Sequence, residues 1–230
     1  MSMGHFSQLP PSVPWSFAAV GPEETSLDDC RVVVVPVPYD STTSYRGGAR
    51  EGPRAIIEAS RYLEDYDIEL EREIYRVGIH TLPEIEPHIG GPENMTERVR
   101  ATVEPFARDG KLLAVLGGEH SVSVGVVKAL HEIHDDLSVL YLDAHGDLRD
   151  EYMGTRWGHA STARRLTECC RVVPVGVRSL CVEEQAFITA SDLPVHYWPP
   201  DVPFDRYVDS VVDDLGEDVY VSIDLDVLDP

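Results

Sequence analysis

Short runs of β-branched and other apolar residues alternate along the chain with longer segments in which apolar and polar positions follow a helical period. Most of the short runs are apolar throughout, which is typical of parallel strands covered on both faces. The expected strands are residues 31–37, 74–79, 111–116, 138–142, 171–177 and 219–223. The expected helices are residues 53–60, 93–109, 122–134, 159–168, 182–190 and 204–215. This order of elements predicts an α/β fold built from successive β-α-β units.

Nothing in the sequence divides the chain into several domains, since it has no internal repeat, low-complexity tract or interdomain linker. Residues 1–14 contain three prolines and no apolar periodicity, so we expect them to form a loosely ordered N-terminal tail. Residues 15–230 are then expected to form one α/β domain, a length that can bury a core without a disulfide or a structural metal.

The balance of charges narrows the range of partners. The 41 acidic residues outnumber 19 basic ones, and the formal net charge is −22. Such a field repels phosphate groups, so neither nucleic acid nor an anionic membrane is expected as a partner. Only Lys111 and Lys128 are lysines, and with the acidic surplus this favours a halophilic, salt-adapted cytosol; an acidic protein of an ordinary cytosol is the alternative.

Cysteine usage and hydropathy predict where the protein works. The 4 cysteines lie in a long chain without a signal peptide, which indicates reduced thiols in a cytoplasmic protein. No apolar run approaches the roughly 18 residues that a membrane-spanning helix needs, so no membrane span is expected.

Acidic and histidine residues directly follow three of the expected strands, those at residues 111–116, 138–142 and 219–223. Because the carboxyl ends of parallel strands share one edge of a sheet, we expect these side chains to converge there. They are His120, Asp143, His145, Asp147, Asp224 and Asp226. Taken singly, an Asp-x-Asp after a strand is usually a turn; the coincidence of three such motifs favours a ligand set.

The spacing and chemistry of this set indicate metal. Asp143, His145 and Asp147 stand at i, i+2 and i+4, so in an extended chain they share one side. Four carboxylates brought together repel one another unless cations balance them, and two divalent cations would. Carboxylates and imidazoles without thiolate favour Mn²⁺, with Zn²⁺, Co²⁺ and Ni²⁺ left open.

The motifs at 117–121, 143–147 and 222–230 resemble the three signatures of the ureohydrolase family, the arginase and agmatinase group of dinuclear manganese enzymes. Residues 38–60 are similar to the N-terminal, substrate-side segment of agmatinase-type members. The resemblance runs from about residue 30 to the last residue. It implies a three-layer α/β/α fold with a mainly parallel, arginase-like sheet, two Mn²⁺ as cofactors, and hydrolysis of a small guanidino substrate to urea and an amine. A homo-oligomer is also expected.

The resemblance also implies roles for single residues. His120, Asp143, Asp147 and Asp224 would hold one metal. Asp143, His145, Asp224 and Asp226 would hold the other, with Asp143 and Asp224 bridging. Asp147 would orient the attacking hydroxide, and His159 would pass a proton to the leaving amine. The alternative for His159 is that it merely begins the helix expected at residues 159–168.

The absence of one arginase pattern bears on the choice of substrate. Residues 148–158 lack the Ser-Gly-Asn-x-His-Gly pattern that meets the amino-acid end of the substrate in arginases, which favours agmatine, cleaved to putrescine and urea in polyamine biosynthesis. Guanidinobutyrate and other guanidino acids stay open, and no substrate-binding residue is assigned.

The ureohydrolase pattern continues beyond the position that corresponds to Pro230, so we expect a domain that is truncated at its C-terminus. A non-catalytic, metal-binding homologue is therefore an alternative function. A metal-dependent deacetylase is a weaker one.

Overall fold

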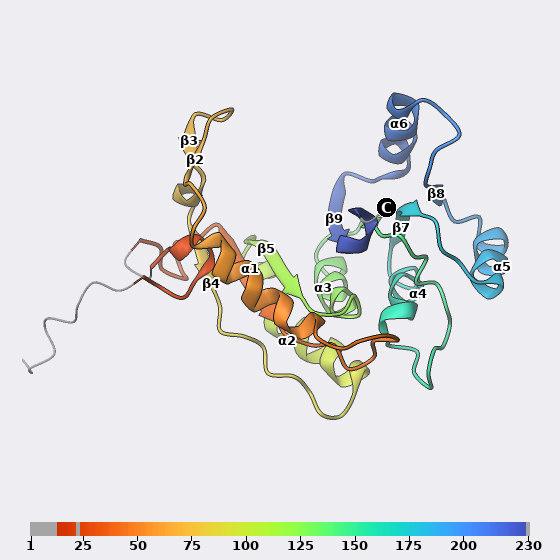
Figure 1. Cartoon of the computed structure of the whole chain (residues 1–230), viewed down its shortest axis with the longest axis horizontal. Helices are drawn as coiled ribbons and strands as arrows, with labels where there is room; N and C mark the ends of the chain where they lie inside the picture. The colour runs from red at the N-terminus through yellow and green to blue at the C-terminus, as the bar shows by residue number, and fades with distance from the viewer. Residues whose placement is uncertain (1–12, 22–23, 229–230) are drawn as a thin grey trace, which may run out of the picture.

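A computed structural model describes residues 13–21 and 24–228. All strands except those of one small hairpin pair in parallel and form two sheets (Figure 1). The first sheet has the order β4-β1-β5, with β4 at Ile79–Thr81, β1 at Val32–Val37 and β5 at Leu112–Gly117. The second has the order β8-β7-β6-β9, with β8 at His196–Tyr197, β7 at Arg171–Val177, β6 at Leu137–Leu142 and β9 at Asp218–Ile223.

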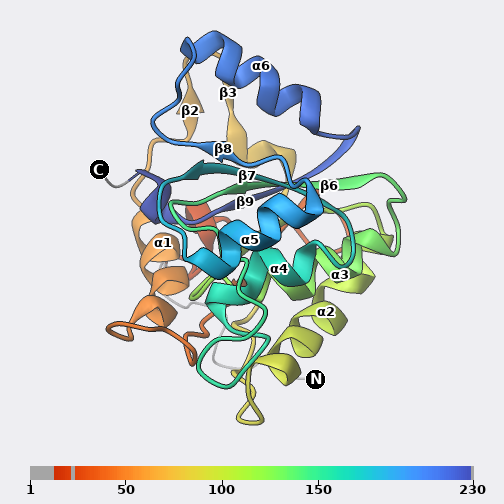
Figure 2. The ribbon, with the colours of Figure 1, turned by 90° about the vertical axis from the view of Figure 1, so that its right-hand side faces the viewer.

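Helices cover both faces of the parallel strands, which gives the expected three-layer α/β/α arrangement. In Figure 2, α6 lies on one face of the second sheet and α4 and α5 lie on the other. The helices are α1 at Gly52–Ser60, α2 at Pro92–Arg108, α3 at Val122–His131, α4 at Thr162–Leu166, α5 at Val182–Ser191 and α6 at Phe204–Asp214.

Helix α3 belongs to two hydrophobic cores at once. Val122 and Val126 pack in a core with β1 and α2, whereas Val124 and Val127 pack in a core with β6, β7 and α4. Seven of its ten residues are buried, as is typical of a helix covered on several sides. The helix therefore links the first sheet to the second.

The carboxyl ends of five parallel strands surround one cavity. The segments that follow β1, β5, β6, β7 and β9 all contribute to its lining. Strands β5 and β9 are edge strands of their sheets and are not paired with each other within the described residues. Residues of both line a groove of about 500 Å³, along which Leu112, Val219 and Val221 lie exposed.

Most of the expected elements are confirmed, but the strand expected at residues 74–79 is wrong. Ile74–Val77 form a 3₁₀ helix and the strand β4 begins at Ile79. The expected helix at 159–168 is a 3₁₀ turn, His159–Ser161, followed by α4, and α3 ends before 134.

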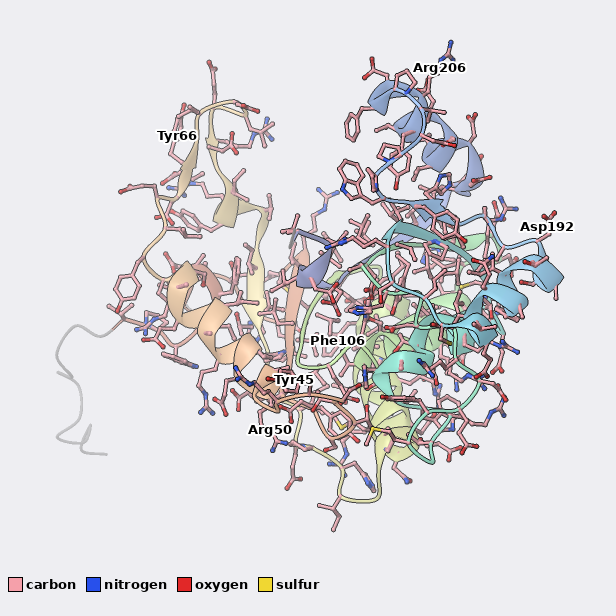
Figure 3. The ribbon with its side chains drawn as sticks, turned by 45° about the vertical axis from the view of Figure 1, so that its right-hand side comes forward. Tyr45, Arg50, Tyr66, Phe106, Asp192 and Arg206 are labelled. Carbon is pink, nitrogen blue, oxygen red and sulfur yellow. The ribbon has the colours of Figure 1, made fainter. Side chains whose placement is uncertain are left out.

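Three short strands were not predicted. Two of them form the hairpin of β2, Tyr66–Asp67, and β3, Arg72–Glu73, which projects from the body of the molecule around Tyr66 in Figure 3; the third is β8.

The loosely ordered tail expected at residues 1–14 falls, up to residue 12, outside the described residues. In residues 13–21 and 24–228, no helix is both long and apolar enough to cross a bilayer.

Candidate active site

The six side chains expected at the sheet edge do line one cavity of about 760 Å³. His120 follows β5, the group from Asp143 to Asp147 follows β6, and Asp224 follows β9, which pairs directly with β6. Thr43 and Tyr45, on the loop after β1, and His159 complete its rim. Tyr45 marks this loop in Figure 3.

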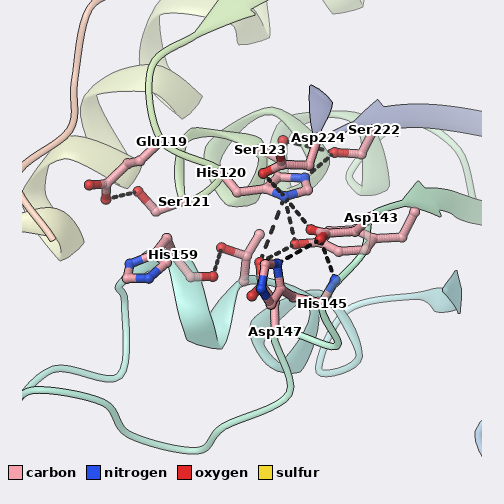
Figure 4. A network of polar contacts seen from close by, with 12 residues as sticks. Glu119, His120, Ser121, Ser123, Asp143, His145, Asp147, His159, Ser222 and Asp224 are labelled. Atoms are coloured by element: carbon pink, nitrogen blue, oxygen red, sulfur yellow. Dashed lines mark hydrogen bonds and ion pairs between the residues drawn. The ribbon is translucent and has the colours of Figure 1, made fainter. Parts of the chain in front are cut away.

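The buried half of the site centres on His120. Its Nδ1 lies 2.9 Å from an oxygen of Asp143, 3.4 Å from one of Asp224 and 3.7 Å from one of Asp147. The Tyr141 ring stacks on the imidazole with centroids 4.3 Å apart, and its hydroxyl donates to Asp147 at 2.7 Å. Ligand atoms of His120, Asp143 and Asp147 lie within 4.8 Å of one another (Figure 4).

The second half opens to solvent and centres on His145, whose side chain is 55% exposed. Its Nδ1 lies 2.9 Å from an oxygen of Asp226 and 3.6 Å from an oxygen of Asp143. The N–H of Ala144 donates to Asp226 at 3.1 Å and so holds that carboxylate in place. Asp143 belongs to both halves, because one of its oxygens faces each imidazole.

Asp224 joins the site less completely. One of its oxygens faces His120 and the other accepts a hydrogen bond from the N–H of Asp226 at 3.1 Å. It belongs to neither of the two close groups of ligand atoms found among the described residues. The bridging role implied for Asp224 is therefore an expectation that this geometry does not test.

The pKa values of three groups in the site are raised; burial contributes to this for Asp147 but opposes it for His120 and His145. Burial opposes a charge on His120, but hydrogen bonds to Asp143 and a second carboxylate outweigh it and raise its pKa to about 10. Hydrogen bonds to Asp143 and another carboxylate raise the pKa of His145 to about 10. Burial, followed by the charge of Asp143, raises the pKa of Asp147 to about 8. The site attracts positive charge, which protons supply when no cation is bound.

The donor set fits divalent cations. Asp143 and Asp147 are buried, and two such carboxylates in one group repel each other unless a cation lies between them. The donors are carboxylate oxygens and imidazole nitrogens, which suit Mn²⁺ and Zn²⁺ among others. There are two such groups and they share Asp143, so each of them could hold an ion.

His159 faces the same cavity from the opposite rim. Its Nε2 lies 2.9 Å from the Ser44 hydroxyl and its Nδ1 lies 3.3 Å from the Thr42 hydroxyl. Burial lowers the pKa of the imidazole below its ordinary value, so the ring is neutral at pH 7. His159 does begin a 3₁₀ turn, as the alternative held, but its side chain lines the cavity.

Several polar residues of the site were not predicted from the sequence. The Ser222 hydroxyl lies 2.7 Å from Nε2 of His120, and Tyr141 stacks on the same ring. Each lies in a strand, two residues before an expected ligand. Because side chains alternate along a strand, this spacing would have placed each of them on the same side of the strand as that ligand. Glu119 lay within a motif, yet its partner Thr42 is 77 residues away, and no local pattern reveals that contact.

Comparison with known proteins agrees with the motifs. The model of the arginase family matches residues 30–230. The N(1)-aminopropylagmatine ureohydrolase of Synechocystis sp. is 36% identical over 216 residues, which cover 90% of this chain and 70% of that protein. The agmatinase of Pyrococcus horikoshii is 40% identical over 211 residues, which cover 88% of this chain and 70% of that protein.

Solved structures agree as well. The agmatine ureohydrolase of Thermoplasma volcanium superposes with a TM-score of 0.81 at 30% identity, covering 95% of this chain and 73% of that one. The arginase of Bacillus caldovelox superposes with a TM-score of 0.68 at 26% identity. Sequence, motifs and fold thus agree, and the chain belongs to the arginase family.

Proposed function

We propose that this protein hydrolyses a small guanidino compound to urea and an amine with two Mn²⁺ bound, and that agmatine is its preferred substrate. The observation that carries the proposal is the convergence of all six motif side chains on one cavity, five of them in two groups that share Asp143. The names of the relatives, agmatinase and N(1)-aminopropylagmatine ureohydrolase, support a guanidino substrate with an amine at its far end.

The overall charge also favours a cationic substrate. In the cavity, two divalent cations would balance the four aspartates of the motifs, and Glu119 and Glu184 stand against Arg46 and Arg149. The chain as a whole has a formal net charge of −22, and such a field draws cations rather than anions toward the protein. Both ends of agmatine are positively charged, whereas a guanidino acid carries a carboxylate that this field repels.

The chain's own residues would share the work as follows. His120, Asp143, Asp147 and Asp224 would hold one ion, and Asp143, His145, Asp224 and Asp226 the other. When bound, the two cations supply the Lewis acidity that lets water act as a nucleophile near neutral pH. Asp147 would accept a hydrogen bond from the attacking water and so orient it toward the guanidinium carbon.

The overall reaction adds one water to the guanidinium ion, breaks the bond from its carbon to the substituted nitrogen, and yields neutral urea and an ammonium ion. The leaving nitrogen carries one hydrogen in the substrate and three in the ammonium ion, so it gains the two protons that the water gives up, one of them as the bond breaks. His159 is neutral at pH 7 because burial lowers its pKa, so it can take up one proton from the water and deliver it to that nitrogen as the bond breaks.

Urea release tests the proposal. The whole chain, saturated with Mn²⁺, is assayed with agmatine, N(1)-aminopropylagmatine, guanidinobutyrate and arginine, and urea is measured over time. We expect the two amines to give the highest kcat/KM. The variant Asp143→Ala should lose this activity, whereas Asp213→Asn, an exposed position on α6, should keep it.

Two results would overturn parts of the proposal. Metal uptake without urea release from any of the four compounds would indicate a metal-binding homologue rather than an enzyme. Faster hydrolysis of guanidinobutyrate than of agmatine would refute the substrate assignment and leave the reaction class intact.

A further inference from the structure

Glu119 is a buried carboxylate, 5% exposed, on the loop between β5 and α3. It accepts three hydrogen bonds. The backbone N–H of Thr42 donates to one oxygen at 2.7 Å; the Thr42 and Ser121 hydroxyls donate to the other at 2.7 and 2.5 Å. Its bond to Ser121 is drawn in Figure 4. The carboxylate therefore fixes the loop after β1 against the loop after β5.

The Thr42 hydroxyl links this carboxylate to His159. A hydroxyl has one hydrogen to donate and two lone pairs that accept. The hydrogen of Thr42 is directed to Glu119, so its oxygen can only accept from other groups. The backbone N–H of His159 donates to that oxygen at 3.0 Å, and Nδ1 of the same residue lies 3.3 Å from it.

This count of hydrogens determines the tautomer of the imidazole. Because the Thr42 oxygen has no hydrogen left to offer, the contact with Nδ1 requires that Nδ1 carry the proton. The neutral ring then has its lone pair on Nε2, which accepts a hydrogen bond from the Ser44 hydroxyl at 2.9 Å. Ser44 lines the cavity, so the basic nitrogen is the one in contact with this residue of the cavity wall.

The backbone is shaped for this contact. A Cβ placed on Gly158 would lie 3.1 Å from the Thr42 hydroxyl oxygen and 3.3 Å from Cβ of the same residue. A side chain at position 158 would push Thr42 away by a few tenths of an ångström, so glycine favours the close approach of this segment to Thr42.

We propose that Glu119 is a positioning residue that acts through the Thr42 hydroxyl and fixes His159 in the tautomer whose Nε2 takes up and delivers the proton. This inference rests on the proposed function, because it assigns a task to the proton shuttle. The geometric part, which nitrogen carries the hydrogen, can be measured without any turnover.

The tautomer is read from the ¹⁵N chemical shifts of the imidazole in the whole chain labelled at histidine, recorded above pH 7 without added Mn²⁺, which would broaden the signals. A His159→Asn variant assigns the resonances. We expect the wild type to carry its proton on Nδ1. Thr42→Val, which keeps the shape of threonine but removes the hydroxyl, should shift the ring to a mixture or to the Nε2–H form.

Two variants control this measurement. Thr42→Ser restores a hydroxyl and should restore the Nδ1–H form. Thr43→Val makes the same change at the neighbouring position, whose hydroxyl faces the backbone oxygen of Asp40 instead, and should leave the His159 signals unchanged.

Glu119→Gln tests the carboxylate itself. An amide nitrogen in place of one carboxylate oxygen donates rather than accepts, so the Thr42 hydroxyl becomes free in part of the population to donate to Nδ1. The Nε2–H form of His159 should therefore appear in this variant. An unchanged ¹⁵N pattern in Glu119→Gln would show that Glu119 does not set the tautomer, and an unchanged pattern in Thr42→Val would overturn the whole inference.

Kinetics supply the second readout. Since only molecules with the lone pair on Nε2 can act, Thr42→Val should lower kcat about 5- to 10-fold with little change in KM, and Thr42→Ser should recover most of it. A larger loss in KM than in kcat would contradict a positioning role. If the wild type released no urea while Thr42→Val still shifted the tautomer, the proposed function would fail and the hydrogen-bond inference would stand.

Discussion

At the scale of single residues, Asp143 is the carboxylate that both halves of the site share. Removing it in Asp143→Ala should weaken both cation sites, whereas His145→Ala should empty mainly the exposed one, because His120 and Asp147 stay in place. Metal analysis after saturation with Mn²⁺ and gel filtration should give fewer ions per chain for Asp143→Ala than for His145→Ala. Equal losses in the two variants would contradict the shared role of Asp143.

The raised pKa values make cation binding depend on pH. His120 and His145, with pKa values of about 10, and Asp147, with a pKa of about 8, hold protons at pH 7 that a cation must displace. Titration calorimetry in buffers of different ionisation enthalpy should therefore show proton release, and affinity should rise from pH 6 to pH 9. Uptake of Mn²⁺ at pH 7 without proton release would contradict the prediction that these groups are protonated before the cation binds.

The stability of the metal-free protein should change with pH in the opposite direction to the cation affinity: it should fall as the pH rises. The pKa of His120 is raised above its unfolded value, so its contribution is complete below about pH 6.5 and is lost as the pH rises toward 10.

The sequence was sufficient to predict which side chains converge on the cavity, but not the contacts that hold them in place. These residues directly follow strands, and the strand ends of a parallel sheet meet at one edge. The link from Glu119 through Thr42 to His159 could not be predicted, because it depends on how three loops pack together.

At the scale of elements, the close packing of α2 on α3 depends on Gly125. A Cβ at this position would lie 2.4 Å from the backbone oxygen of Thr96 and 2.8 Å from Cβ of Val99. Gly125→Ala should therefore destabilise the fold by roughly 1–3 kcal/mol through overpacking, even though alanine favours helices. Urea denaturation measures this change.

Gly47→Ala is the matched control, because its added Cβ would meet only an Asp40 oxygen at an ordinary 3.8 Å. Equal stability of the two variants would show that α2 and α3 can move apart at no cost.

The strands β1, β6 and β7 could be predicted because most of their residues are buried on both faces, which makes them mostly apolar. The 3₁₀ helix Ile74–Val77 was wrongly expected to be a strand, since its apolar residues resemble one locally and the turn at Gly78, with φ of 86°, separates it from β4. The two-residue strands are too short to show any alternation, so pairing with neighbours alone defines them.

At the scale of the whole molecule, the net charge of −22 opposes the compact state at low ionic strength. Raising KCl from 0.1 M to 2 M should raise the melting temperature, because salt screens the repulsion between carboxylates. The double variant Asp213→Asn and Glu217→Gln removes two exposed charges, one in the last turn of α6 and one in the loop before β9. It should be more stable than the wild type at low salt and gain less from KCl; a wild-type melting temperature that falls with KCl would contradict this explanation.

The division of the parallel strands into two sheets has a consequence for how the molecule opens. Within the described residues the sheets share no ladder, and α3 connects their cores. The hydrogen bonds of each sheet therefore form a unit that can exchange with solvent without breaking a ladder of the other, and α3 couples the two units through its packing. The cavity draws His120 from the end of one sheet and Asp143 from the other, so a cation held between them would slow exchange in both units together.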